Sequence, residues 1–214
     1  MRQSIWRAGY RLAPAFAMAM LLGGVMTDRT LAQAPIAPGK VVSGTLSFEG
    51  HATMGDFTGT TTTLTGYMSG GPELASIQGW VEAPVGTLVT GKGKRDADLN
   101  KSMESDKYPV IRYELDSLTP GHVAGDTTEV VLHGRFVIHG VTRDADLPGR
   151  VLLDGTGARV RADAPLNLKD YRIGGLSKML GMLKMHEDIE VHVDVAFGSD
   201  VTPGTSSLAA PRTE

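Results

Sequence analysis

Apolar and polar residues alternate along most of this chain, and this period of two constrains its fold more than any other feature. The alternation is clearest in residues 129–138 and 188–197. The apolar faces of these two segments consist of Val130, Leu132, Phe136 and Ile138, and of Ile189, Val191, Val193, Val195 and Phe197. Successive side chains of a β-strand point to opposite faces, so each segment predicts a strand with one buried face.

Other segments predict further strands. They are residues 41–49, 58–70, 76–90, 110–118, 142–154 and 158–168. In the first of them, Val42, Leu46 and Phe48 share the predicted inner face. Pro84 requires a sheet edge or a bulge, because proline cannot donate to a ladder. Residues 171–186 are ambiguous by period and could begin as a strand and end as a loop or helical turn.

About eight strands with glycine-rich turns predict an all-β domain, in which one antiparallel sheet closes into a barrel or folds as a sandwich. The inner face is aliphatic and includes Gly44, Gly66, Gly79 and Gly134. An eight-stranded barrel either fills its interior with side chains or leaves room for one slender apolar ligand. These small inner residues favour the barrel.

One compact helical segment interrupts the strands, at residues 94–109. Asp98 is the predicted N-cap, Leu99 and Met103 share one helical face, and Tyr108 precedes Pro109, which ends the helix. Such a short helix needs tertiary support, so we expect it to close one end of the barrel.

Residues 1–34 have the layout of a secretory signal peptide. Arg2, Arg7 and Arg11 precede an uncharged apolar run, and cleavage is expected after Ala32 or Ala34. An uncleaved anchor is the alternative. We therefore expect a periplasmic or secreted protein, with a barrel domain at residues 41–198 and a disordered tail at residues 199–214.

Charge and cysteine content exclude several classes. Residues 1–32 carry four arginines and one aspartate, so their removal takes the formal net charge from −3 to −6. No basic footprint for nucleic acid is present. The chain has no cysteine, which excludes disulfides, thiolate metal sites and a cysteine nucleophile. Neither a nucleophile elbow nor a phosphate loop occurs, so we expect no enzymatic activity and no cofactor.

Several motifs together resemble the YceI-like family. They are TG at residues 90–91, RDADL at 95–99, KYPVI at 107–111, LHGRFVIHGVTR at 132–143, DY at 170–171 and the final alternating valine strand. The resemblance covers residues 41–197 in the family's order. It implies an exported, lipocalin-like antiparallel barrel with a helix across one end, which binds a polyisoprenoid or a similar long amphiphilic lipid.

The predicted site follows from the inner strand faces and the family signature. We expect the ligand to be lined by Leu46, Phe48, Ile77, Val81, Leu132, Phe136, Ile138, Val191, Val193 and Phe197. We expect Met179, Met182 and Met185 to border the barrel mouth. The signature residues with a mainly structural role are Arg95, Asp96, Leu99, Tyr108, Pro109 and Gly140, of which Gly140 makes a turn with His139.

Other interpretations remain at this point. The barrel could be filled by its own side chains and serve as an interaction or stress-response module, or the protein could contact a membrane or a partner protein transiently. The methionines with His186 could bind Cu(I), because thioethers are soft ligands. His133 and His192 could share a surface zinc ion if their strands were neighbours.

Overall fold

The computed structural model describes residues 35–53, 55–154, 157–174, 177–178 and 183–199. The chain divides into the units Met1–Ala32 and Gln33–Glu214, and all described residues belong to the second. The predicted signal peptide and residues 200–214 of the predicted tail lie outside the described residues. Within the described part, no helix is long and apolar enough to span a membrane.

Ten strands make up the sheet. They are β1 (Gly39–Ala52), β2 (Phe57–Thr61), β3 (Thr65–Met68), β4 (Gly79–Pro84), β5 (Val110–Ala124), β6 (Thr127–Ile138), β7 (Val141–Leu153), β8 (Gly157–Asn167), β9 (Ser177–Lys178) and β10 (Leu183–Ser199). The helices are α1 (Gly93–Ser102) and the 3-10 helices η1 (Leu74–Ser76), η2 (Val85–Thr87) and η3 (Leu168–Tyr171).

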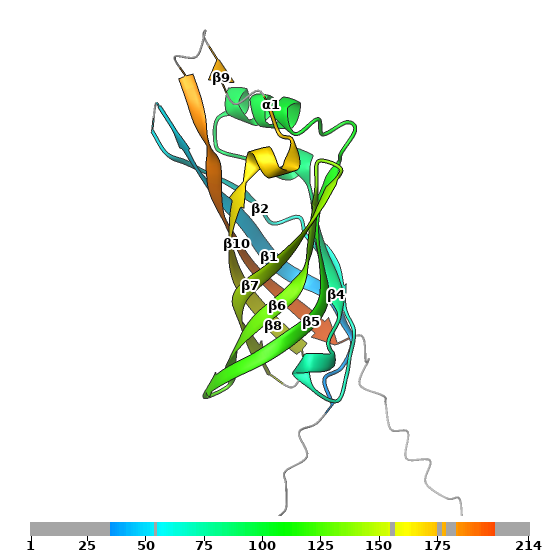
Figure 1. Ribbon diagram of the computed structural model, residues 1–214. Coiled ribbons are helices and arrows are strands. Elements are labelled where there is room, and N and C mark those ends of the chain that lie inside the picture. Colours follow the sequence, from blue (N-terminus) through cyan, green and yellow to red (C-terminus); the bar gives the residue numbers. More distant parts are fainter. Residues whose placement is uncertain (1–34, 54, 155–156, 175–176, 179–182, 200–214) are drawn as a thin grey trace, which may run out of the picture. The chain divides into compact units, whose positions relative to one another are not determined.

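The sheet closes into a barrel, which confirms the predicted fold. All strand pairs are antiparallel, in the order β1-β3-β4-β5-β6-β7-β8-β10, and β10 pairs again with β1 (Figure 1). β2 extends the wall beside residues 46–50 of β1, and β9 pairs with the start of β10. Closure removes the exposed edges that an open sheet of this size would present. The helix α1 lies at the end where β10 begins, and η1 lies at the opposite end (Figure 1).

The prediction for Val42 is wrong, and a β-bulge is the reason. Along the β1–β10 ladder, Val41 pairs with Phe197 and Ser43 with Ala196, so Val42 is the extra residue. A bulge reverses the alternation of the residues beyond it. Val41 therefore packs against the core, whereas Val42 is 68% exposed.

Residues 58–70 form two strands rather than one. β2 pairs with β1 at Leu46–Gly50, whereas β3 pairs with β1 at Gly39 and Lys40, so the chain leaves the ladder between them. Residues 76–90 also contain only the short β4, which ends at Pro84 before η2. The backbone N–H of Val85 then donates to the carbonyl of Pro109 at 2.8 Å.

The predicted helix forms, but its bounds differ from the prediction. α1 begins at Gly93 with Lys92 as its N-cap, so Asp98 lies inside the helix and is not the cap. It ends at Ser102, well before Pro109, because Glu104 adopts a left-handed conformation at φ 45°. The ambiguous residues 171–186 begin at the last residue of η3 and include β9 and the start of β10. β10 begins five residues before the predicted position 188.

Candidate functional site

The barrel encloses a cavity of about 580 Å³, a volume typical of small-molecule sites. All ten side chains predicted to line the ligand lie at its wall: Leu46, Phe48, Ile77, Val81, Leu132, Phe136, Ile138, Val191, Val193 and Phe197. Their contact with a ligand stays a prediction. The cavity also counts against a barrel filled by its own side chains.

Sequence reasoning missed part of this wall. The inner faces of β7 and β8 contribute Leu147, Val151, Ala158, Ala162 and Ala164. Their spacing carries the same period of two, but alanine is depleted in strands, so the signal was weak. The short side chains of these alanines take up little of the interior in front of β8.

The first described residues contribute to the end of the cavity that faces η1. Ile36 exchanges two backbone hydrogen bonds with Gly71, at 2.8 and 2.9 Å. Ile36, Leu74 of η1 and the buried Met68 line the cavity there. The surface of the cavity at this end is therefore apolar.

The end that faces α1 reaches the surface. Lys92 and Lys94 line the cavity beside Thr53 of the β1–β2 connection, and all three are exposed. The guanidinium of Arg95 stacks on Phe57 of β2, 4.3 Å from the ring centre. The cavity thus opens between α1 and the β1–β2 connection, and cations stand at the rim.

The predicted methionine mouth is described only at Met185, which is half-buried and lines the cavity. Met179 and Met182 lie outside the described residues, so the mouth and the Cu(I) interpretation stay predictions. Leu99 and Met103 line the cavity from the α1 side. Met103, which directly follows α1, is buried, whereas α1 itself contains no buried residue.

The other signature residues hold the α1 end in place. The Oδ1 atom of Asp96 accepts hydrogen bonds from the backbone N–H and the hydroxyl of Thr90, at 2.8 and 2.6 Å. These bonds stabilise the carboxylate and lower the pKa of Asp96. Tyr108 packs on the β6–β7 turn, where Gly140 has φ 72° and an added Cβ would lie 2.5 Å from Tyr108 Cε1.

Tyr113 places a hydroxyl among the apolar residues of the wall. It lies 3.1 Å from the carbonyl oxygens of both Leu132 and Ala145 and donates its hydrogen to them. Burial raises the pKa of this phenol. Because the protein backbone already satisfies the hydroxyl, this part of the wall offers a ligand apolar contact rather than a hydrogen bond.

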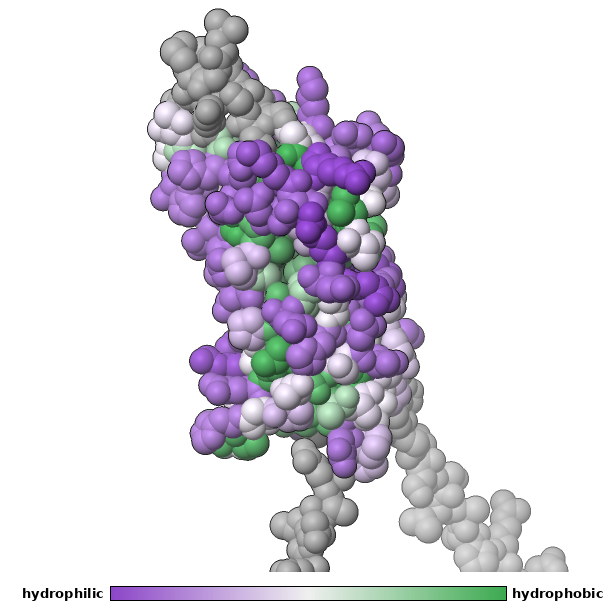
Figure 2. All heavy atoms as spheres, viewed as in Figure 1, coloured by the Kyte–Doolittle hydropathy of each residue, from purple (hydrophilic) through white to green (hydrophobic). Residues whose placement is uncertain are grey.

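Charged side chains lie on the outer wall, and the face seen in Figure 2 is mostly hydrophilic with scattered apolar groups. Arg159 and Arg161 both donate to Asp194, at distances from 2.6 to 2.9 Å. Arg135 bridges Glu114 and Asp116. These pairs are consistent with a water-facing exterior.

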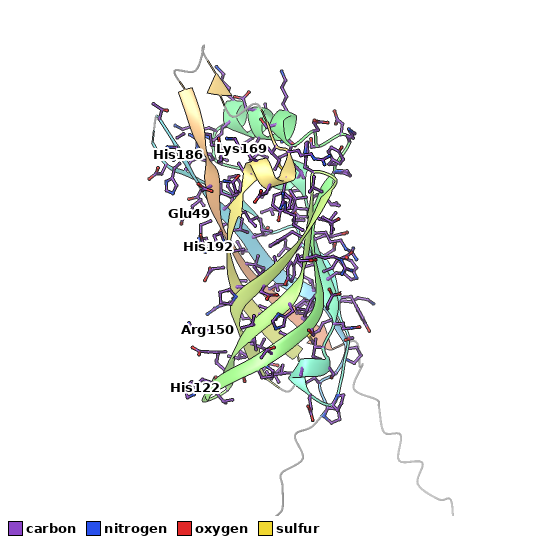
Figure 3. The ribbon with its side chains drawn as sticks, viewed as in Figure 1. Glu49, His122, Arg150, Lys169, His186 and His192 are labelled. Atoms are coloured by element: carbon purple, nitrogen blue, oxygen red, sulfur yellow. The ribbon has the colours of Figure 1, made fainter. Side chains whose placement is uncertain are left out.

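The zinc interpretation is wrong, because β6 and β10 are not neighbours. β7 and β8 lie between them, so His133 and His192 are on different parts of the wall. His133 pairs with Asp146, and His192 pairs with Asp163 and lies near Glu49 (Figure 3). The described residues contain no group of three histidine and carboxylate side chains that could hold a metal ion.

Comparisons with known proteins agree with this fold. Residues 40–197 match the family model described as the YceI-like domain. No curated protein matches the chain. A polyisoprenoid-binding domain from Saccharophagus degradans, implicated in plant cell wall breakdown, matches with a TM-score of 0.61 and 17% identity, covering 77% of this chain and 99% of that one. BcnA from Burkholderia cenocepacia matches with a TM-score of 0.60 and 11% identity, and the match covers 72% of this chain and 95% of BcnA.

Proposed function

Because this chain belongs to the YceI-like family, we propose that it binds a long-chain amphiphilic lipid, such as a polyisoprenoid, inside its barrel. The observation that carries the proposal is the apolar cavity, whose lining extends from Ile36 and Leu74 to the exposed Lys92 and Lys94 beside α1. A cavity with an apolar lining and cations at one end suits a ligand with an apolar tail and a polar head. The polyisoprenoid-binding domain from Saccharophagus degradans has a similar fold.

Hydrophobic burial supplies the binding energy in this proposal. Each buried methylene contributes about 0.8 kcal/mol, so ten of them contribute about 8 kcal/mol before the cost of ordering the chain. No strong polar contact inside the barrel is needed. The head group would remain at the rim beside Lys92 and Lys94, where it can stay hydrated.

The proposal also covers where the protein acts and what it does with its lipid. We propose that residues 1–34 export the protein to the periplasm or the medium, and that it holds its lipid for carriage, storage or stress protection without catalysing a reaction. The layout of the first 34 residues supports export.

A test combines extraction with a matched pair of variants. Organic extracts of the purified protein are examined by mass spectrometry, and the delipidated protein is offered a polyprenol. We expect one lipid per chain and uptake of the polyprenol. Ala162→Phe places a ring in the middle of the cavity and should prevent uptake, whereas Val131→Phe on the outer face of β6 should not.

Circular dichroism shows whether both variants remain folded. The proposal fails if the parent protein neither contains lipid nor takes up the polyprenol, or if folded Ala162→Phe takes it up as readily as the parent.

A further inference from the structure

Three residues other than glycine have positive φ in the described chain, and they meet at the end of the barrel that carries α1. They are Glu104 at 45°, His139 at 52° and Arg172 at 57°. Glu104 follows α1, His139 is in the β6–β7 turn, and Arg172 follows η3. Left-handed backbone costs about 1–2 kcal/mol in such residues, and it persists where surrounding contacts impose it. Three strained segments therefore support one another at a single junction.

His139 joins the three segments through its imidazole. Its Nδ1 lies 3.0 Å from the carbonyl oxygen of Tyr171, the residue before Arg172. Its Nε2 lies 3.4 Å from Oε1 of Glu104. The ring packs against that of Tyr108, with the ring centres 4.5 Å apart. The side chain of His139 is only 7% exposed.

The hydrogen-bond chemistry depends on the protonation of His139. A carbonyl oxygen can only accept, so Nδ1 carries the hydrogen, and a neutral ring then presents a lone pair at Nε2. That lone pair faces the carboxylate of Glu104, which also only accepts. Among the buried side-chain nitrogen and oxygen atoms of the described residues, only His139 Nε2 has no hydrogen-bond partner. Protonation would turn it into a donor to Glu104.

The other charged groups at the junction are balanced in sign. Lys107 lies 4.7 Å from the ring centre of Tyr108 and 3.8 Å from the carboxylate of Glu104. On the η3 side, Arg143 pairs with Asp170 at 3.3 Å. Arg143 is thus paired away from His139, whereas Lys107 and His139 approach different oxygens of the same Glu104 carboxylate. Lys107 is exposed and 3.8 Å away, so Glu104 Oε1 still faces the buried Nε2 and gains a donor when His139 is protonated.

The junction lies directly beside the residue that anchors α1 over the cavity. α1 buries none of its own residues, and Met103, directly before Glu104, is the buried anchor that lines the cavity. Loss of the contacts of Glu104 and Tyr108 would leave α1 held mainly by Met103, by Arg95 on Phe57 and by Asp96 with Thr90.

We propose that His139 and Glu104 form a latch that mild acid strengthens, so that α1 is held more firmly over the cavity and a bound ligand leaves more slowly. This inference rests on the proposed lipid binding. Its direct physical consequence, a tighter junction in acid, does not require a ligand.

The test measures ligand release and backbone opening separately. Retinol, a neutral and fluorescent isoprenoid alcohol, is bound to the protein and then transferred to phosphatidylcholine vesicles at pH 5 and pH 8. We expect release from the parent protein to be about fivefold slower at pH 5, the effect of one partly exposed ion pair. Hydrogen exchange at residues 103–108, corrected for its intrinsic pH dependence, should slow in parallel.

Two variants remove the latch without disturbing the backbone. His139→Asn should keep the turn, because asparagine tolerates positive φ and Asn-Gly is the preferred pair for this kind of hairpin turn. Glu104→Gln keeps the side-chain shape and removes the charge. Both should abolish the pH dependence, and the surface variant His192→Asn should retain it.

Equal opening of residues 103–108 at both pH values in the parent would overturn the inference, as would an unchanged pH dependence in His139→Asn. If retinol does not bind at all, the proposed function is in question, and hydrogen exchange still decides whether the latch exists.

Discussion

The ring of Tyr113 lies in the space that the missing side chain of Gly134 leaves open. A Cβ added to Gly134 would lie 2.9 Å from both Cζ and Oη of Tyr113, and closer still to the carbonyl oxygen of Glu114. The ring also packs on Phe136, with the ring centres 4.8 Å apart. An aromatic side chain over a strand glycine covers exposed backbone, as in aromatic rescue of glycine. Through its hydrogen bonds to Leu132 and Ala145, the ring extends from β5 across β6 to β7.

Gly134→Ala should destabilise the barrel. The new methyl group would displace the Tyr113 ring and press on the β5 backbone, so we expect the free energy of unfolding to fall by about 1–3 kcal/mol. Denaturant unfolding measures the change. Gly93→Ala is the matched control, because nothing lies within 4 Å of a Cβ there. Equal stability of Gly134→Ala and the parent protein would contradict the packing described above.

The Tyr113 hydroxyl should make the stability sensitive to alkali. Burial raises its pKa, so the folded protein keeps the phenol neutral while the unfolded chain ionises above pH about 10. The stabilising effect is complete below that pH and is lost as the pH rises through the folded pKa. Unfolding measured at pH 8 and pH 11 should therefore show a smaller alkaline loss in Tyr113→Phe than in the parent. At pH 8 that variant should lose about 1 kcal/mol, the net worth of its hydrogen bond.

His192 should contribute stability at acid pH. Its Nδ1 lies 2.6 Å from Asp163, and this hydrogen bond raises the pKa of the imidazole. A raised pKa means that the contribution is complete below the ordinary value of about 6.5 and disappears as the pH rises through the folded value. The pair is partly exposed, so the effect should stay below about 1 kcal/mol.

Proton NMR titration of the histidine rings tests this prediction. Asp163→Asn should lower the pKa of His192 and leave the titration of His122, at the distant β5–β6 hairpin, unchanged (Figure 3). A His192 titration that is identical in Asp163→Asn and the parent would rule out the assigned cause.

Thr90 should influence the protonation of Asp96. The hydroxyl of Thr90 is the largest cause of the lowered Asp96 pKa. This contribution to stability is present above the ordinary carboxyl pKa and is lost as the pH falls through the folded value. Thr90→Val keeps the backbone hydrogen bond and the side-chain shape, so carbon NMR of the Asp96 carboxyl should show a partial return toward the ordinary pKa. If the pKa of Asp96 returned fully to the ordinary value, or did not change, the hydroxyl and the backbone N–H of Thr90 would not both lower it.

The strands that the sequence predicts best are those that bury one face over a long, regular run. β6 and β10 follow their alternation because each inward side chain meets the core and each outward one meets water. β1 breaks the rule at Val42 because its bulge arises from pairing with β10, which lies far along the chain. The bounds of α1 also differ from the prediction. The helix starts at Gly93 rather than after Asp98, and the side chain of Asp96 in its first turns bonds to Thr90, which lies before the helix.

The candidate site also combines features that the sequence predicts with features that depend on tertiary contacts. Alternation was enough to select ten wall residues, since a closed barrel turns every apolar face inward. It could not reveal whether the interior was filled, because that depends on which side chains oppose one another across the barrel. The short alanine side chains of β8 and the Tyr113 ring over Gly134 both lie at the wall of the cavity that remains.

The sequence by itself determined the strand-rich composition, the inward and outward faces, the short helix and the family, because these depend on residue types and on spacings of a few positions. Only the tertiary structure decided that β1 meets β10, that β6 and β10 lie apart, and that Glu104 faces His139. Each of these relationships joins residues that are distant along the chain. These spatial relationships follow from how the strands of the closed sheet pair and twist, and no local sequence pattern encodes them.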